Sequence, residues 1–166
     1  MSKEKDLCFP DMIYLNDFGG NFQGFFQAVY EVFKNDFIIS NTKYLGQRVA
    51  TKKYPLVDEK YHRTFYHITH EGEIESDRHP DLRRMERIRF PRYIIENCPH
   101  SKLLVWVEMR NKEERIHIFH EDEGYLLVLT KRDNYLLLWT AFYIEHQHQK
   151  KKKIAKYQAY KKANTA

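Results

Sequence analysis

Histidine, arginine, lysine, threonine and tyrosine supply most of the side chains in this sequence that could do chemistry, and together they suit cleavage of RNA without a metal ion. Histidine has an unperturbed pKa near neutrality, so it can take or give the proton that moves when a 2′-hydroxyl attacks the neighbouring phosphorus. Arginine contacts phosphate through paired hydrogen bonds and stabilises the charge that develops there. Threonine and tyrosine hydroxyls can donate to phosphate oxygens.

The candidates lie in three segments: FYHITHEGE contains His67, HPDLRRMERIRFPRYIIEN contains Arg84 and Arg87, and NYLLLWTAFYIEH contains Thr140. Each has a simpler interpretation. His67 fits a buried core histidine, and the arginines fit the solvated face of a helix. Thr140 fits a β-branched packing residue in an apolar strand. The residues alone leave both interpretations open.

Several other chemistries lack support in the sequence. It contains no P-loop, GxGxxG or GxSxG motif, and Cys8 and Cys98 are not part of a C-x-x-C pair. The spacings His67-x-x-His70 and His146-x-His148 bring no third metal ligand with them. We therefore expect no metal and no cofactor.

Positive charge is concentrated at the C-terminal end. Seven lysines and no acids lie between Lys150 and Lys162, whereas the whole chain carries +5, so the remainder carries −2. This pattern predicts one domain over 1–149 and a basic helix or tail over 150–166. Such a segment binds the phosphate backbone of nucleic acid or is simply solvated.

The first residues, MSKEKDLCFPD, are charged and lack the apolar stretch of a signal peptide. The apolar run from Tyr135 to Ile144 is too short to cross a bilayer. We expect a soluble cytoplasmic protein with no membrane partner.

Hydrophobic spacing predicts an amphipathic helix from Asn21 to Phe37, with Asn21 as its N-cap. Residues 44–49 suit a short strand, and the alternation within 65–73 predicts a strand or strand end. Residues 79–97 suggest two short helices, the first capped by Asp81 and the second with Pro91 in its first turn.

The C-terminal half has the pattern of a β-meander. Short polar turns separate four β-rich runs, which are Leu103 to Met109, Arg115 to His120, Tyr125 to Thr130 and Tyr135 to Glu145. The last two runs are apolar on both faces, which predicts that something covers each side. A helix follows, with Ile154 and Tyr157 facing the body. The fold class expected is α+β, with N-terminal helices packed on a C-terminal antiparallel meander of about four strands and a basic C-terminal helix.

Strict alternation in the last strand would put Thr140 on one face with Leu136, Leu138 and Phe142. The other face would carry Leu137, Trp139, Ala141 and Tyr143.

The order of these segments resembles phage-type members of the barnase–EndoU–colicin–RelE-like nuclease superfamily. The resemblance rests on FYHITHEG, then the arginine-rich HPDLRRMERIRFPRYIIEN, then TKRDNYLLLWTAFYIE followed by a Lys/Tyr-rich helix, and it covers roughly residues 60–160. It implies a metal-independent ribonuclease fold of the kind found in toxins and phage-associated proteins.

Within that resemblance, His67 is similar to the motif histidine, a general acid or base. Arg84 and Arg87 are similar to helix arginines that clamp phosphate, and Thr140 to the threonine of a TAY motif. The aromatic position of that motif is Phe142 here, so a phenol would have to come from Tyr143 on the opposite face. The substrate-binding set implied is Arg92, Lys131, Arg132, Tyr143, Lys150, Lys151, Lys152 and Lys153.

The expected activity is thus a metal-independent endoribonuclease, with RNA as substrate and an antitoxin or immunity protein as a further partner. Two alternatives stay open. One is a nucleic-acid-binding module that uses the lysine-rich tail without catalysis. The other is an interaction protein of mobile-element origin.

Overall fold

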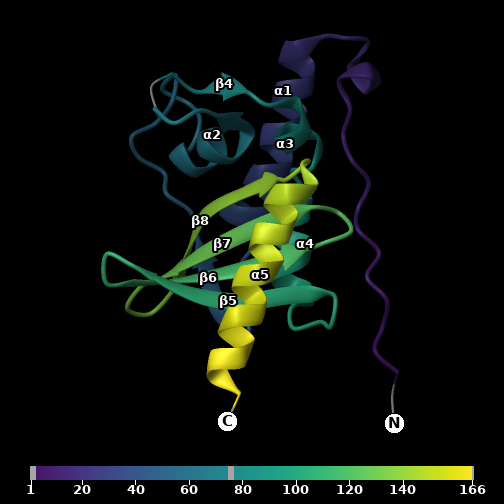
Figure 1. The fold of residues 1–166 in the computed structure, drawn as a ribbon. Helices are drawn as coiled ribbons and strands as arrows, with labels where there is room; N and C mark the ends of the chain where they lie inside the picture. Colours follow the sequence, from purple (N-terminus) through teal and green to yellow (C-terminus); the bar gives the residue numbers. More distant parts are fainter. Residues whose placement is uncertain (1–2, 75–76, 166) are drawn as a thin grey trace.

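The structure is a computed structural model that describes residues 3–74 and 77–165. Six strands form one sheet in the order β1-β2-β8-β7-β6-β5. One face of this sheet packs against a layer of helices that precede β5 in the chain, and a single long helix, α5, crosses the other face (Figure 1). The α+β class expected from the sequence is confirmed.

The predicted meander is present. Its strands are β5 (Leu103–Arg110), β6 (Glu113–His120), β7 (Tyr125–Lys131) and β8 (Leu136–Tyr143), each antiparallel to the next. A hairpin of β1 (Lys43–Tyr44) and β2 (Gln47–Ala50) extends the sheet beyond β8. β2 runs parallel to β8 but pairs only with Leu136 and Leu137. Within the described residues, the outer edge of β8 from Leu138 onward therefore has no neighbouring strand.

The predicted N-terminal helix is also present. A 3-10 turn, η1 (Leu15–Phe18), leads into α1 (Phe22–Phe33), which continues as a π-helical turn, η2 (Lys34–Ile39). The Asn21 side chain accepts a hydrogen bond from the Gly24 amide at 3.1 Å, so the expected N-cap is confirmed. Phe25, Val29 and Phe33 are fully buried in the main core.

The strand expected over 65–73 is wrong for most of its length. Residues Arg63–Thr69 form helix α2, and only His70–Glu71 (β3) are extended. Helical spacing buries Phe65 and Ile68 on the same side, facing the core. The buried Thr69 hydroxyl donates to the Phe65 carbonyl at 2.8 Å, which satisfies it within the helix. Packing by two apolar residues three positions apart outweighs the short alternating pattern.

Between α2 and the meander lie β4 (His79–Pro80), α3 (Leu82–Glu86) and α4 (Phe90–Asn97). Asp81 accepts a hydrogen bond from the Arg84 amide at 3.1 Å, and Pro91 lies in the first turn of α4, as expected. The proline lacks an amide hydrogen, which costs nothing at a position where no intrahelical acceptor exists.

The last two strands of the meander are apolar on both faces, and helix α5 (Gln147–Asn164) covers the face that the other helices leave open. Ile154 and Tyr157, together with Tyr160, pack on a second apolar cluster formed by Trp106, Phe119, Leu126, Val128 and Ile144. No residue of α5 is fully buried, and its Lys156 ammonium pairs with Glu108 at 3.0 Å. In the described part of the chain, no helix is long and apolar enough to span a bilayer.

A β-bulge in β8 overturns the strict alternation expected there. Val128 of β7 faces Thr140, but the next residue, Leu129, faces Leu138, so Trp139 is an extra residue in β8. Leu138 points into the main core, and after the bulge the core-facing residue is Ala141. Thr140 is therefore on the α5 face and does not share a face with Leu138.

Candidate active site

His67 lines a pocket of about 510 Å³ between α2 and the edge of β8. The lining residues are Lys52, Pro55, Arg63, Thr64, His67, Leu137, Leu138 and Trp139. Among these lining residues, all from the described part of the chain, two are cations and none is an acid, so the pocket favours an anionic ligand. His67 is half-buried at this surface, which fits a histidine that meets a ligand while it is held in place by the fold.

The start of α2 is tied to the loop that carries Lys52. The Thr64 hydroxyl accepts a hydrogen bond from the Lys52 amide at 2.7 Å, and the Thr64 amide donates to the Lys52 carbonyl at 3.0 Å. The Arg63 side chain donates through Nε to the Pro55 carbonyl at 2.9 Å. These bonds fix the loop against the helix and hold both cations at the pocket that contains His67.

The core-histidine interpretation fits His70 better than His67. His70 is buried, stacks on Tyr66 at 4.0 Å between ring centres, and places Nδ1 3.0 Å from the Tyr66 carbonyl and 2.9 Å from the Thr69 hydroxyl. Burial lowers the pKa of His70. Of the two histidines on this segment, the structure buries His70 and leaves His67 at the pocket.

Sequence reasoning did not find Lys52, Arg63 or Trp139. A helical assignment of 63–69 would have placed Arg63 one turn before His67, on the same face. Treating this segment as a strand hid that relation. Nothing local links Lys52 or Trp139 to His67, because the loop and the strand are brought together only by the tertiary fold.

Arg84 is held at the junction between α2 and α3. Its Nη1 donates to the His70 carbonyl at 2.8 Å, its Nε lies 3.4 Å from Asp81, and its guanidinium carbon lies 5.3 Å from the centre of the Phe142 ring. The side chain is only 15 % exposed, so the simple picture of a solvated arginine is wrong here. Burial lowers the pKa of Arg84, with Asp81 acting in the opposite direction.

Arg87 is also largely shielded from solvent, with a side chain 12 % exposed. Its Nη1 donates to the Arg83 carbonyl at 3.0 Å, and its guanidinium carbon lies 4.0 Å from the centre of the Tyr143 ring. Its Nε is buried and has no hydrogen-bond partner among the described residues. Tyr143 itself also lines a cleft of about 640 Å³ next to Glu71, Asp81 and Glu145.

The predicted catalytic residues are therefore arranged along β8. His67 shares a pocket with Leu138 and Trp139, whereas Arg84 and Arg87 contact the rings of Phe142 and Tyr143. Trp139 and Tyr143 are four positions apart, which is roughly 13 Å of extended strand. Thr140 lies between the two groups, half-buried on the α5 face opposite Val128. Arg84 and Arg87 thus contact the last two rings of β8, and His67 contributes to a separate pocket on the same strand.

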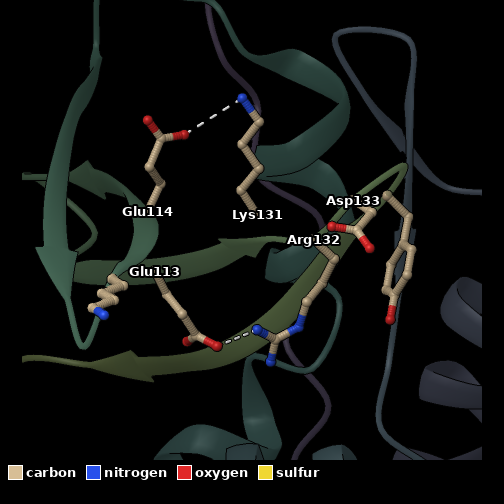
Figure 2. A pocket seen from close by; sticks show the side chains of 7 residues that line it. Glu113, Glu114, Lys131, Arg132 and Asp133 are labelled. Carbon is tan, nitrogen blue, oxygen red and sulfur yellow. Dashed lines mark hydrogen bonds and ion pairs between the residues drawn. The ribbon is translucent and has the colours of Figure 1, made fainter.

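Arg92, Lys131 and Arg132 are engaged in ion pairs. Arg92 bonds Glu96 at 2.8 Å and lies 3.4 Å from Asp36. Figure 2 shows the cleft beside the β7–β8 turn, in which Lys131 pairs with Glu114 at 3.5 Å and Arg132 with Glu113. The acids across this cleft offset the two positive charges that the sequence singled out.

The lysines expected to bind the substrate backbone lie at the start of α5. Lys151 and Lys152 are exposed, while Lys150 and Lys153 are half-buried. The Lys150 side chain lies against Gly124, and burial lowers the pKa of Lys153. Only part of the predicted set is thus presented to solvent. Residues 3–74 and 77–165 contain no group of three or more His, Cys, Asp or Glu that could hold a metal ion.

Comparison of the chain with protein-family models, with curated proteins and with solved structures gives no match.

Proposed function

We propose that this protein binds RNA along β8 and cleaves it by metal-independent acid–base chemistry at the His67 pocket. The observation that carries the proposal is the set of described residues that line this pocket: one imidazole and two cations, with no acid among them, on walls that are otherwise mainly apolar. A phosphodiester needs a proton acceptor beside it and positive charge around it, and this set supplies both.

In the proposed reaction, His67 takes the proton of a ribose 2′-hydroxyl, and the 2′-oxygen attacks the adjacent phosphorus. The bond from phosphorus to the 5′-oxygen breaks, so the products are a 2′,3′-cyclic phosphate and a 5′-hydroxyl that takes its proton from water. Lys52 and Arg63 stabilise the charge on the phosphorane oxygens. Lys52 is exposed, so solvent reaches this end of the pocket.

The other predicted site residues on or beside β8 would extend the contact between the protein and RNA along this strand. Thr140 follows Trp139 in the strand, and its hydroxyl offers a donor on the α5 face. Tyr143 offers the phenol that Phe142 lacks, but it lies under Arg87 at the far end of the strand. We propose that Arg84 and Arg87 position these two rings. An antitoxin or immunity protein stays an expectation from the resemblance alone.

The test is to incubate the protein with single-stranded RNA in the presence of EDTA and to follow the cleavage products. Wild type should cleave, and His67→Ala should lose about 10²–10⁴-fold of the rate, the range for one general acid or base. His148→Ala is the matched control, because His148 is exposed at the start of α5. Absence of cleavage by wild type, or equal rates for wild type and His67→Ala, would exclude the proposed reaction.

A second candidate function is RNA binding without cleavage, and a different observation favours it. Lys151, Lys152, Lys161 and Lys162 are exposed on α5 and form no ion pair with the described residues. About ten residues of helix separate the two pairs, roughly 15 Å. Such a helix can neutralise several phosphates of one strand.

This candidate is tested by the salt dependence of RNA binding. Changing the four exposed lysines to glutamine should weaken binding and reduce the slope of log affinity against log salt by about 0.7 for each phosphate that is no longer neutralised. Lys131→Gln with Arg132→Gln is the control, since acids already offset those charges. Strong binding by a protein that never cleaves RNA would favour this candidate over the nuclease.

A further inference from the structure

We infer that the His67 pocket holds an unpaired nucleobase stacked on Trp139, so that the substrate is single-stranded RNA and not duplex. This inference rests on the proposed function, because it names the substrate class of that same site. It concerns the apolar part of the pocket, which acid–base chemistry alone does not require.

Trp139 is placed at the pocket by the β-bulge. As the extra residue in β8, it stands beyond the point where β2 stops pairing, and it remains 38 % exposed. The Arg115 guanidinium carbon lies 4.5 Å from the centre of its ring, so Arg115 supports the indole from the sheet. An aromatic ring held in this way and left open to solvent is a platform for a planar ligand.

The rest of the lining fits the remainder of a nucleotide. Pro55, Leu137 and Leu138 add apolar wall, and Lys52 and Arg63 add positive charge for the phosphate. A volume of about 510 Å³ is within the range of about 300–1,000 Å³ typical of small-ligand sites. Stacking on an aromatic side chain strengthens the binding of any base, because every base has a π-face.

A base inside a duplex cannot reach this platform. It would first have to leave its stack, and the free energy that this costs is comparable to the free energy gained by stacking on one ring. An unpaired base in a loop or a single strand is already available. The pocket therefore selects single-stranded RNA through the base, while His67 and the cations act on its phosphate.

The fluorescence of Trp139 reports directly on this stacking. The chain has two tryptophans, and the other, Trp106, is buried in the cluster beneath α5. The probe is a short single-stranded 2′-O-methyl RNA, which binds but lacks the nucleophile for cleavage. We expect it to quench wild type, and to leave the Trp139→Phe variant, whose only tryptophan is Trp106, without a response.

Affinities measured independently of fluorescence complete the test. Trp139→Ala should bind the single strand roughly 5- to 150-fold more weakly, the equivalent of about 1–3 kcal/mol. Trp139→Phe should retain most of the affinity, because a phenyl ring still stacks. The same sequence annealed to its complement should bind wild type more weakly and cause little quenching.

The outcomes separate this inference from the nuclease proposal. Cleavage of RNA without a Trp139 response, or equal quenching by single strand and duplex, overturns the base site and leaves the nuclease. Quenching by the single strand from a protein that does not cleave leaves the base site and overturns the nuclease. A protein that shows neither contradicts both.

Discussion

The guanidinium carbon of Arg87 lies 4.0 Å from the centre of the Tyr143 ring, which joins the turn after α3 to the last residue of β8. Arg83, within α3, lies 5.9 Å from the same ring and pairs with Glu145. The two arginines thus meet one tyrosine, but Arg87 is 12 % exposed and Arg83 is 52 % exposed. Because the two arginines contact the same ring but differ in exposure, their alanine variants can be compared directly.

Arg87→Ala should lower the free energy of unfolding by about 1–3 kcal/mol, because it removes a buried cation–π contact and the packing of a long side chain. Arg83→Ala should lower it much less, since solvent screens an exposed ion pair. Urea denaturation of both variants measures the difference. Equal losses would mean that the Tyr143 contact does not stabilise the fold.

Gly124 allows the end of β8 to close on the β6–β7 turn. Its φ is +63°, and a Cβ atom there would lie 2.6 Å from the Ile144 carbonyl oxygen. Gly124→Ala should therefore lower the free energy of unfolding by about 2–4 kcal/mol, from backbone strain plus the clash.

Gly20 is the control for that change. Its φ is +80°, but an added Cβ would meet nothing within 4 Å. Gly20→Ala should cost only the backbone strain, about 1–2 kcal/mol. Thermal or urea unfolding that shows the same loss for both glycines would exclude a steric role for Gly124.

Thr130 and Thr140, both on the α5 face of the sheet, allow an effect on stability to be distinguished from an effect on activity. Thr130 Oγ1 is buried without a hydrogen-bond partner among the described residues, so Thr130→Val should leave the free energy of unfolding unchanged or raise it by up to about 1 kcal/mol. Thr140→Val keeps the shape of a half-buried residue and should also fold normally.

The two variants should differ in activity. If the Thr140 hydroxyl donates to RNA, its loss should slow cleavage roughly 10- to 150-fold, the equivalent of about 1.5–3 kcal/mol for a bond to a charged group. Thr130→Val should cleave at the wild-type rate. A fully active, stable Thr140→Val would assign Thr140 to packing alone.

The stability of the fold should decrease as the solution becomes acidic. Burial lowers the pKa of four histidines below the usual 6.5, and these are His62, His70, His117 and His120. The unfolded chain then binds more protons than the folded one below about pH 6.5, so the stabilisation present above this pH is lost as the pH falls through the folded pKa values.

Urea unfolding at pH 7.5 and pH 5.5 should therefore give a smaller free energy at pH 5.5. His70→Phe keeps a ring on Tyr66 and should reduce the difference between the two pH values, whatever its effect at pH 7.5. A free energy of unfolding that rises on acidification, or a His70→Phe variant with the full pH dependence, would contradict this account.

Local signals were sufficient for much of this fold. The four strands of the meander follow from β-rich runs separated by polar turns, and Asn21 and Asp81 cap the helices that they were expected to cap. Helix α5 follows from its apolar positions, Ile154 and Tyr157. Each of these features depends on residues close together in the chain, so the pattern of the sequence contains it.

Other features depend on distant residues. The parallel pairing of Val49 with Leu136 has no local signature, and neither does the bulge that places Trp139 at the surface. The segment from Arg63 to Thr69 is so short that its sequence fits both the period of a strand and that of a helix. It forms a helix because this conformation packs Phe65 in the core. The sequence pointed to His67 and to the strand that contains Trp139 as parts of a candidate site. It did not point to Lys52 or Arg63, because tertiary contacts bring these two cations to the pocket.

The extra residue in β8 can also be separated from the rest of the strand. Leu138 and Thr140 pair with Leu129 and Val128, which are consecutive in β7, so without Trp139 the two strands would pair as a regular ladder. Thr140 would stay on the α5 face, and Ala141 would stay in the main core. A one-residue deletion at this point should therefore remove the indole and the bulge together, while it leaves Tyr143 beside Arg87.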